Sequence, residues 1–256
     1  MRVRLTVLII GLLSVAGRAS AQGSPEDYHV ELGLTWWRVA PEITLSTGAG
    51  GTPIDFVSQF AIERDRFREF RVVLKPARKH KLRYSSVPIR YTASATLGQP
   101  ITFAGQTYPA GTTVGSELNW TLMRVGYEWD AVATSQGFIG VFADVKYNKV
   151  DATLTGPAPV GAHTFERSVP VPTVGGTVRG YLARTSSVTV EFTALKVKTG
   201  DADAKFYDFD AYLTSNFGRN AGVLLGYRRV STDYAVEGDT GNLKMKGPYI
   251  GGVLRF

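Results

Sequence analysis

Cysteine is absent from this 256-residue chain. That absence excludes both a disulfide framework and a zinc site built on thiolates. Histidine is scarce as well, with three in the whole sequence, so few positions are available for a histidine-based catalytic centre. Backbone hydrogen bonds and packing must therefore stabilise the fold, and we expect no metal ion and no cofactor.

Long hydrophobic runs are also missing, except for one near the N-terminus. Residues 5–16 are predominantly apolar, follow a basic start and precede the small-residue sequence Ala-Ser-Ala at 19–21. A run of about a dozen residues is short of the roughly 20 that a spanning helix needs, so a retained anchor is the weaker interpretation. The arrangement is typical of a secretory signal peptide. We expect cleavage after Ala21, which leaves a signal peptide at 1–21 and a mature domain at 22–256.

Basic residues are only slightly in excess. The formal net charge is +7, and removal of Arg2, Arg4 and Arg18 with the signal peptide leaves 7 − 3 = +4. The basic residues are spread along the chain and form no patch interleaved with aromatic residues, so the sequence gives little support for nucleic-acid binding. We therefore expect no nucleic-acid partner.

Apolar residues of the mature chain recur at alternate positions in segments of roughly ten residues, which is the period of a β-strand. In one such segment Ile139, Val141 and Val145 alternate with Asp144 and Lys146. An exported chain with this pattern is either a soluble β-sandwich or a closed antiparallel transmembrane β-barrel. We predict about ten strands, with eight or twelve as alternatives. They lie at 28–39, 67–76, 81–95, 117–131, 137–154, 172–184, 187–198, 206–217, 221–236 and 243–256.

Two features favour the barrel over the sandwich. Short and long links alternate, as expected for short periplasmic turns and longer extracellular loops. Aromatic residues on the apolar face also fall toward strand ends, where an amphipathic ring can lie at headgroup level. The short turns are 77–80, 133–136, 185–186 and 218–220, and the longer links are 40–66, 96–116, 155–171, 199–205 and 237–242. The aromatic residues are Trp36, Trp129, Tyr147, Tyr207 and Tyr227.

The last predicted strand ends on an aromatic residue and places Ile250, Leu254 and Phe256 on one face. With the signal peptide and the strand rhythm, it resembles small single-chain Gram-negative outer-membrane β-barrel proteins, a match to the class and to no specific member. The resemblance implies that these three residues form an assembly signal read by the barrel-insertion machinery. It also implies a protein of the bacterial outer membrane that contacts outer-membrane lipid. Proteins of this class can bind an extracellular ligand, and the sequence does not identify one here.

If Phe256, Leu213 and Val145 face lipid, the opposite face of each strand lines the lumen. A barrel of about ten strands is largely filled by its own side chains, and charges withdrawn from water must be paired. We therefore predict a polar, side-chain-filled lumen, and we expect a loop charge such as Asp239 to add almost nothing to stability. The predicted charge network is Glu31, Arg71, Arg124, Glu128, Asp144, Lys146, Arg179, Glu191, Asp208, Asp210 and Arg228, with Glu69, Lys75 and Arg255 on the same face.

The leading functional hypothesis is a non-enzymatic barrel with a structural or surface-binding role through its extracellular loops. A porin-like small-solute channel lined by the same charges is one alternative. A rim hydrolase is the other, because the class that the chain resembles includes outer-membrane proteases and lipid A deacylases. His163 is the sole histidine expected on the extracellular side, where Asp151, Asp203 and Asp233 come from neighbouring strands. No motif ties these residues together, and we assign no catalytic residue.

Residues 54–62 are too apolar for a bare loop tip. Phe56 and Phe60 have the i, i+4 spacing of one turn of an amphipathic helix, and an extra strand is the alternative. An exposed patch of this kind would mark a binding surface. We favour packing onto the mouth of the barrel.

Overall fold

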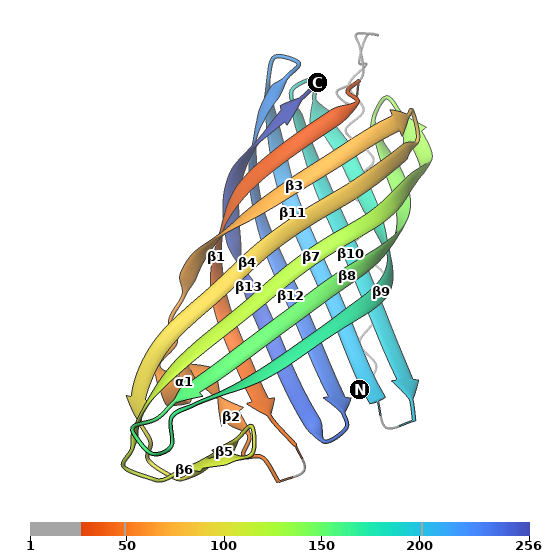
Figure 1. The fold of residues 1–256 in the computed structure, drawn as a ribbon. Helices are drawn as coiled ribbons and strands as arrows, with labels where there is room; N and C mark the ends of the chain where they lie inside the picture. Colours follow the sequence, from red (N-terminus) through yellow and green to blue (C-terminus); the bar gives the residue numbers. More distant parts are fainter. Residues whose placement is uncertain (1–26, 49, 201) are drawn as a thin grey trace, which may run out of the picture.

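The computed structural model describes residues 27–48, 50–200 and 202–256. Ten long strands pair antiparallel in chain order, and β1 pairs with β13 to close the sheet into a barrel (Figure 1). The prediction of a closed barrel of ten antiparallel strands is therefore confirmed, whereas the predicted signal peptide lies outside the described residues. The wall consists of β1 (Val30–Ser46), β3 (Asp65–Ala77), β4 (His80–Thr96), β7 (Thr113–Thr134), β8 (Gly137–Thr155), β9 (Ala162–Ala183), β10 (Ser186–Thr199), β11 (Ala202–Phe217), β12 (Ala221–Val236) and β13 (Asp239–Arg255).

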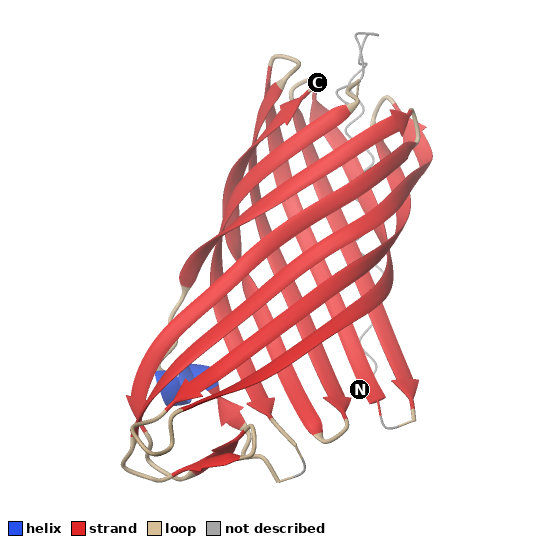
Figure 2. Ribbon diagram, viewed as in Figure 1, coloured by secondary structure: helices blue, strands red, loops and turns tan. Residues whose placement is uncertain are grey.

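Four short elements gather at the end of the barrel that carries the longer links, the lower end in Figure 2; we call it the extracellular end, because membrane barrels of this kind have their longer loops on that side. They are β2 (Ile54–Asp55), α1 (Phe56–Phe60), β5 (Ile101–Phe103) and β6 (Gln106–Tyr108). The side chain of Asp55 caps α1 by accepting hydrogen bonds from the backbone N–H groups of Val57 and Ser58, at 3.0 and 3.2 Å. Phe56 and Phe60 are buried, so the segment 54–62 packs into the mouth of the barrel. In the described part of the chain, no helix is long and apolar enough to cross a membrane.

The links at the periplasmic end are short, as predicted, but all five extracellular links are shorter than expected, and three of them lose more than half of their length. The loops predicted at 155–171, 199–205 and 237–242 shrink to 156–161, 200–201 and 237–238. The strands on either side continue outward past the band of apolar residues that faces lipid. Sequence reasoning ended each strand where its lipid-facing alternation stopped, although the backbone pairing did not stop there.

The polarity of the wall reverses along the length of the barrel. On the outer surface of β1, the exposed Leu34 and Trp36 give way to Arg38 and Glu42 toward the extracellular end. On β8, Val145 and Tyr147 are followed by Lys149 and Asp151 on the same face. An apolar outer surface suits lipid and a polar one suits water. The extracellular part of the wall therefore stands above the bilayer, and Trp36 and Tyr147 lie near the boundary.

The hydrogen-bonded ladder is not complete around this extracellular part. Strands β3 and β4 pair only as far as Phe70 opposite Ser86. Strands β9 and β10 pair only as far as Val174 opposite Ala194. Beyond these points each strand pairs with its other neighbour alone, so the barrel is closed within the membrane and opens at two places above it.

Candidate functional site

The periplasmic half of the barrel interior holds the predicted charge network. Its eleven residues come from β1, β3 and β7 through β12. Nine of them are buried, and Glu31 and Arg71 are half-buried. Glu69, Lys75 and Arg255, expected on the same face, are buried as well. The structure thus brings these residues together inside the barrel, where each charge depends on its partners because water is excluded.

Asp208 accepts three hydrogen bonds from two cations of the network. Arg228 donates from Nε to Oδ1 at 3.0 Å and from Nη2 to Oδ2 at 2.9 Å, a bidentate contact. Lys146 Nζ donates to the same Oδ2 at 2.7 Å. The remaining guanidinium nitrogen of Arg228, Nη1, donates to Glu69 Oε1 at 2.8 Å, which joins β12 to β3 across the interior.

A second cluster is built around Arg71. Its Nη2 donates to Glu69 Oε2 at 2.7 Å and to Asp210 Oδ2 at 2.9 Å. The Tyr249 hydroxyl donates to Asp210 Oδ1 at 2.8 Å, and the ring centroid of Tyr249 lies 5.3 Å from the guanidinium carbon of Arg71. These bonds connect β3, β11 and β13 through the barrel interior. The network therefore links strands that are not neighbours in the sheet.

Sequence reasoning missed three members of the network: Lys81, Arg83 and Asp130. Arg83 donates to Glu128 Oε2 and to Glu191 Oε2, each at 2.5 Å. Lys81 Nζ lies 3.0 Å from both Glu128 Oε1 and Asp130 Oδ2. All three are buried. The sequence contains the pattern that would have placed two of them inside the barrel. Lys81 and Arg83 alternate with Leu82 and Tyr84, which are exposed on the outer face.

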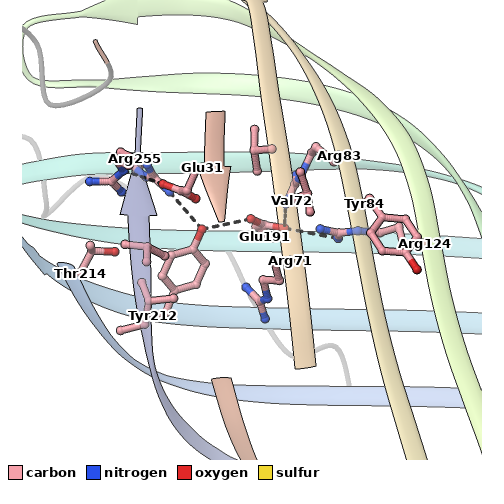
Figure 3. A pocket seen from close by; sticks show the side chains of 14 residues that line it. Glu31, Arg71, Val72, Arg83, Tyr84, Arg124, Glu191, Tyr212, Thr214 and Arg255 are labelled. Atoms are coloured by element: carbon pink, nitrogen blue, oxygen red, sulfur yellow. Dashed lines mark hydrogen bonds and ion pairs between the residues drawn. The ribbon is translucent and has the colours of Figure 1, made fainter. Parts of the chain in front are cut away.

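Arg124 is held more loosely than the other buried arginines. Its Nη1 lies 3.5 Å from Glu191 Oε2 and its Nε lies 3.9 Å from Asp144 Oδ2. A cavity of about 30 Å³ remains beside Arg124, Glu191 and Arg255 (Figure 3). That volume accommodates roughly one or two water molecules. The periplasmic half is therefore filled by its own side chains.

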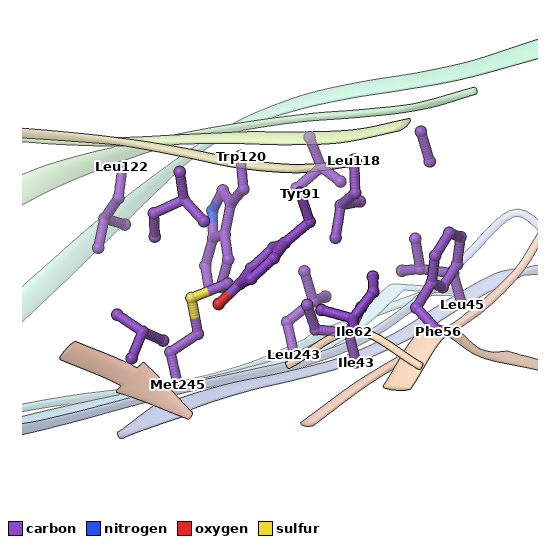
Figure 4. Packing of buried hydrophobic residues seen from close by; sticks show 14 of the residues in the cluster. Ile43, Leu45, Phe56, Ile62, Tyr91, Leu118, Trp120, Leu122, Leu243 and Met245 are labelled. Atoms are coloured by element: carbon purple, nitrogen blue, oxygen red, sulfur yellow. The ribbon is translucent and has the colours of Figure 1, made fainter. Parts of the chain in front are cut away.

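The extracellular half of the interior is apolar, which corrects the prediction of a polar lumen along the whole barrel. Inward residues of β1, β4, β7 and β13 form one hydrophobic cluster that also includes Phe56 and Phe60 of α1. Trp120, Leu243 and Met245 lie at its centre (Figure 4). The physical reason is that this half stands in water: its outer surface is polar, so its inner surface supplies the hydrophobic core, as in a soluble barrel.

Loops of the extracellular end cover this apolar chamber and are bonded to one another. Ala104 N donates to Thr47 Oγ1 at 2.8 Å and Thr52 N donates to Thr102 O at 3.0 Å. Tyr108 is buried, and its hydroxyl donates to Leu154 O at 2.9 Å. This burial raises the pKa of Tyr108. The loops thus form an ordered cap.

The hydrolase hypothesis receives no support from the geometry around His163. Its Nε2 lies 3.0 Å from Val160 O, and its ring meets the Tyr108 ring edge-on at 6.3 Å. Asp151 pairs with Lys149, and Asp233 accepts from Asn242. No described carboxylate bonds to this histidine. Within the described residues there is also no group of three or more histidines and carboxylates that could hold a metal ion.

Comparison with known proteins places the fold in a class. No family model and no curated protein sequence matches the chain. Among solved structures, the outer membrane protease OmpT of Escherichia coli aligns with a TM-score of 0.58 at 8% identity, over 93% of this chain and 99% of that one. The translocator domain of the autotransporter NalP of Neisseria meningitidis aligns at 0.46 and 11% identity, over 89% and 88%. The attachment invasion locus protein Ail of Yersinia pestis aligns at 0.40 and 9%, over 89% and 99%.

The chain has the fold of outer-membrane β-barrel proteins. This conclusion rests on the closed ten-strand barrel, the apolar outer band and the fold shared with OmpT. Identities of this size establish a shared fold and no shared activity. The role of this member must therefore be argued from its own interior and surface.

Proposed function

We propose that this protein is a non-conducting outer-membrane barrel that acts at the cell surface as a binding protein. The observation that carries the proposal is the filled interior. Paired charges occupy the periplasmic half, an apolar core occupies the extracellular half, and the cavity of about 30 Å³ holds little more than a water molecule. A permeation path would have to cross both halves.

The extracellular part supports the binding role. The strands project past the bilayer, and the capping loops are bonded to one another, so the exposed surface is a preformed scaffold. A preformed surface binds with less ordering cost than mobile loops do. The surface differs from the one expected from the sequence, because strand extensions rather than long loops provide much of it.

Planar-bilayer recording tests the proposal directly. We expect the purified, refolded protein to give no sustained open-channel conductance, while a heat-dependent change in gel mobility of the same preparation shows that the barrel has folded. Steady ohmic conductance from the unmodified protein would contradict the proposal. The charged residues of the periplasmic half would then have to line a water-filled pore.

A further inference from the structure

Charged residues on the outer surface of the barrel are ordered by height. On every long strand except β7 and β9, the first charged residue that follows the apolar band on the outward face, toward the extracellular end, is a lysine or an arginine. Carboxylates lie farther out, since Glu42 lies beyond Arg38 on β1 and Asp233 lies beyond Arg229 on β12. We call these first basic residues the basic belt. It lies just outside the aromatic residues at the lipid boundary, which is the height of lipid headgroups.

The belt is dense on β12, β13, β1 and β3, which are consecutive neighbours in the sheet. Arg229 lies directly opposite Lys246 in the β12–β13 ladder, and Arg38 lies directly opposite Arg66 in the β1–β3 ladder. Arg68 is the next outward residue of β3 on the periplasmic side of Arg66. We call these five residues the basic cluster. Its β1–β3 half is Arg38, Arg66 and Arg68, and its β12–β13 half is Arg229 and Lys246.

The arginines of the basic cluster lack carboxylate partners. Within the described residues, none of the four takes part in an ion pair. The carboxylate on the outer face of β1, Glu42, bonds to Lys246 Nζ at 2.5 Å. Asp65 has the inward parity of β3 and accepts from the backbone N–H of Arg66 at 2.6 Å. Like charges in direct cross-strand positions destabilise a sheet, so an anion between Arg38 and Arg66 removes a repulsion.

Other basic residues of the belt have a carboxylate beside them. These pairs are Arg90 with Glu117 at 3.0 Å, Lys149 with Asp151 at 3.2 Å, and Lys205 directly opposite Asp233. The basic cluster therefore keeps a positive charge that these other positions share with an acidic neighbour.

The position of the cluster relative to the apolar band suits a lipid headgroup. Trp36 lies on the periplasmic side of Arg38 along the outward face of β1, and Tyr227 lies on the periplasmic side of Arg229 along β12. Both aromatic side chains are exposed. A lipid whose acyl chains lie against the band therefore has its phosphate toward the extracellular end, beside the arginines. Guanidinium groups bind phosphate oxygens in bidentate geometry.

The width of the cluster favours a headgroup with two phosphates. Neighbouring strands lie about 4.8 Å apart, so the three spacings from β12 to β3 amount to about 14 Å along the wall. A single phosphate contacts one half of the cluster and leaves the other without an anion. Two phosphates on one headgroup contact both halves.

A protein partner is the competing occupant, and the height of the cluster disfavours it. Lipid headgroups surround the wall at this level, so a soluble protein would have to displace them before it reached the arginines. A lipid already lies beside the apolar band and needs no such displacement.

We propose that the basic cluster binds an outer-leaflet lipid whose headgroup carries two phosphates, one at the β1–β3 half and the other at the β12–β13 half. The acyl chains of this lipid lie against the apolar band, on the periplasmic side of the cluster. The site is on the outer surface of the barrel, so it does not depend on whether the lumen conducts.

Native mass spectrometry of the purified protein in dodecyl maltoside tests this proposal. The probes are hexaacyl lipid A with two phosphates and its monophosphoryl form with the same acyl chains. We expect one bisphosphorylated lipid to bind, and to bind more tightly than the monophosphorylated lipid. Arg38→Gln with Arg66→Gln should lower the affinity for the bisphosphorylated lipid roughly 30-fold, at about fivefold per basic charge near a lipid surface.

Lys149→Gln with Lys196→Gln is the matched control. It also removes two basic residues of the belt, but from β8 and β10, which do not adjoin the four strands of the cluster. We expect this variant to bind the bisphosphorylated lipid within about twofold of wild type. An equal loss in both variants would show that the belt acts as a general surface charge, and it would contradict a site on β12, β13, β1 and β3.

Inorganic phosphate added at the concentration of the lipid distinguishes a lipid site from a site for a free anion, and we expect it to displace no lipid. Displacement by inorganic phosphate, equal binding of the two lipids, or no lipid retained by the wild type would overturn the proposal. Each variant is first checked for folding by heat-dependent gel mobility. If Arg38→Gln with Arg66→Gln does not fold, Arg229→Gln with Lys246→Gln tests the other half in the same way. Conductance in a planar bilayer would contradict the proposed function and leave this site untouched.

Discussion

Arg228 illustrates at the scale of single residues how the periplasmic half is held together. Its guanidinium nitrogens bond Asp208 and Glu69, and all three side chains are buried. A buried ion pair adds little net stability, but loss of one partner leaves a charge without compensation. The network is thus most sensitive to the removal of a residue that serves several partners.

Arg228→Ala should therefore lower the free energy of unfolding by on the order of 3–5 kcal/mol. Urea titration of the folded barrel in detergent, followed by tryptophan fluorescence, measures the change. Arg229→Ala is the control, because Arg229 is the next residue on β12 and is exposed on the outer face. A change below about 0.5 kcal/mol is expected there. Equal effects of the two substitutions would show that loss of a buried charge partner does not destabilise the lumenal network.

Asp239 was expected to lie in a loop, and that placement was wrong. It is the first residue of β13, it is buried, and it accepts a hydrogen bond from Gly48 N at 2.8 Å. Its carboxylate also bonds Arg167 and raises the pKa of that guanidinium. The error has the same origin as the overlong loops, since the strands continue farther than the lipid-facing alternation does.

At the scale of elements, prolines determine where neighbouring strands separate. Pro88 and the pair Pro170 and Pro172 end ladders, whereas Pro248 interrupts the β1–β13 ladder only briefly: pairing stops after Trp37 and resumes at Ala40. One missing donor is tolerated when the strands stay in register beyond it. Where the strands do not return to register, the ladder ends, after one missing donor at Pro88 and after two at Pro172 and Pro170.

Pro170→Thr with Pro172→Thr should extend the pairing of β9 with β10. Threonine restores the backbone donors and is compatible with a strand. Hydrogen exchange should then show new protection of the amides at positions 170, 172, 196 and 198. The amides of Val190 and Phe192, already within the paired region, are the internal control. Unchanged exchange at the four positions would mean that something other than the prolines keeps the strands apart.

The plug formed by α1 is a second test at this scale. Phe56→Ala removes a fully buried ring from the extracellular chamber and should lower the free energy of unfolding by roughly 3–5 kcal/mol, the usual cost of such a cavity. Ser58→Ala on the exposed side of the same helix is the matched control. Thermal unfolding of both variants in detergent measures the difference. An unaffected Phe56 variant would indicate that α1 contributes little to the core.

At the scale of the whole molecule, the barrel combines two environments in one wall. Its periplasmic part has an apolar exterior and a charged interior, and its extracellular part has the opposite arrangement. The reversal lets a single continuous sheet contact lipid along its periplasmic part and water along its extracellular part. It also explains why the interior is closed twice, by ion pairs in one half and by hydrophobic packing in the other.

Removal of Phe256 tests the proposed assembly signal, with Leu254 and Ile250 as its other members. These three residues are exposed on the outer face of the last strand or just after it. Deletion of Phe256 should reduce the amount of heat-modifiable barrel in the outer membrane far more than it reduces synthesis. Immunoblots of heated and unheated membrane fractions measure both quantities. Equal amounts of folded barrel from both chains would show that the terminal aromatic residue is not required for assembly.

The sequence alone predicted about ten strands, their order along the chain and the two faces of each strand, because a period of two is a local property of the backbone; closure of the barrel confirmed the number as ten. The sequence also identified most of the inward charges of the periplasmic half. Only the tertiary structure decided which face is inside at each height, since that depends on where the wall leaves the bilayer. The partners of Lys81 and Arg83 and the divergence of β9 from β10 likewise depend on neighbours distant in sequence. Alternation shows that two faces differ, and the surrounding solvent decides which of them must be buried.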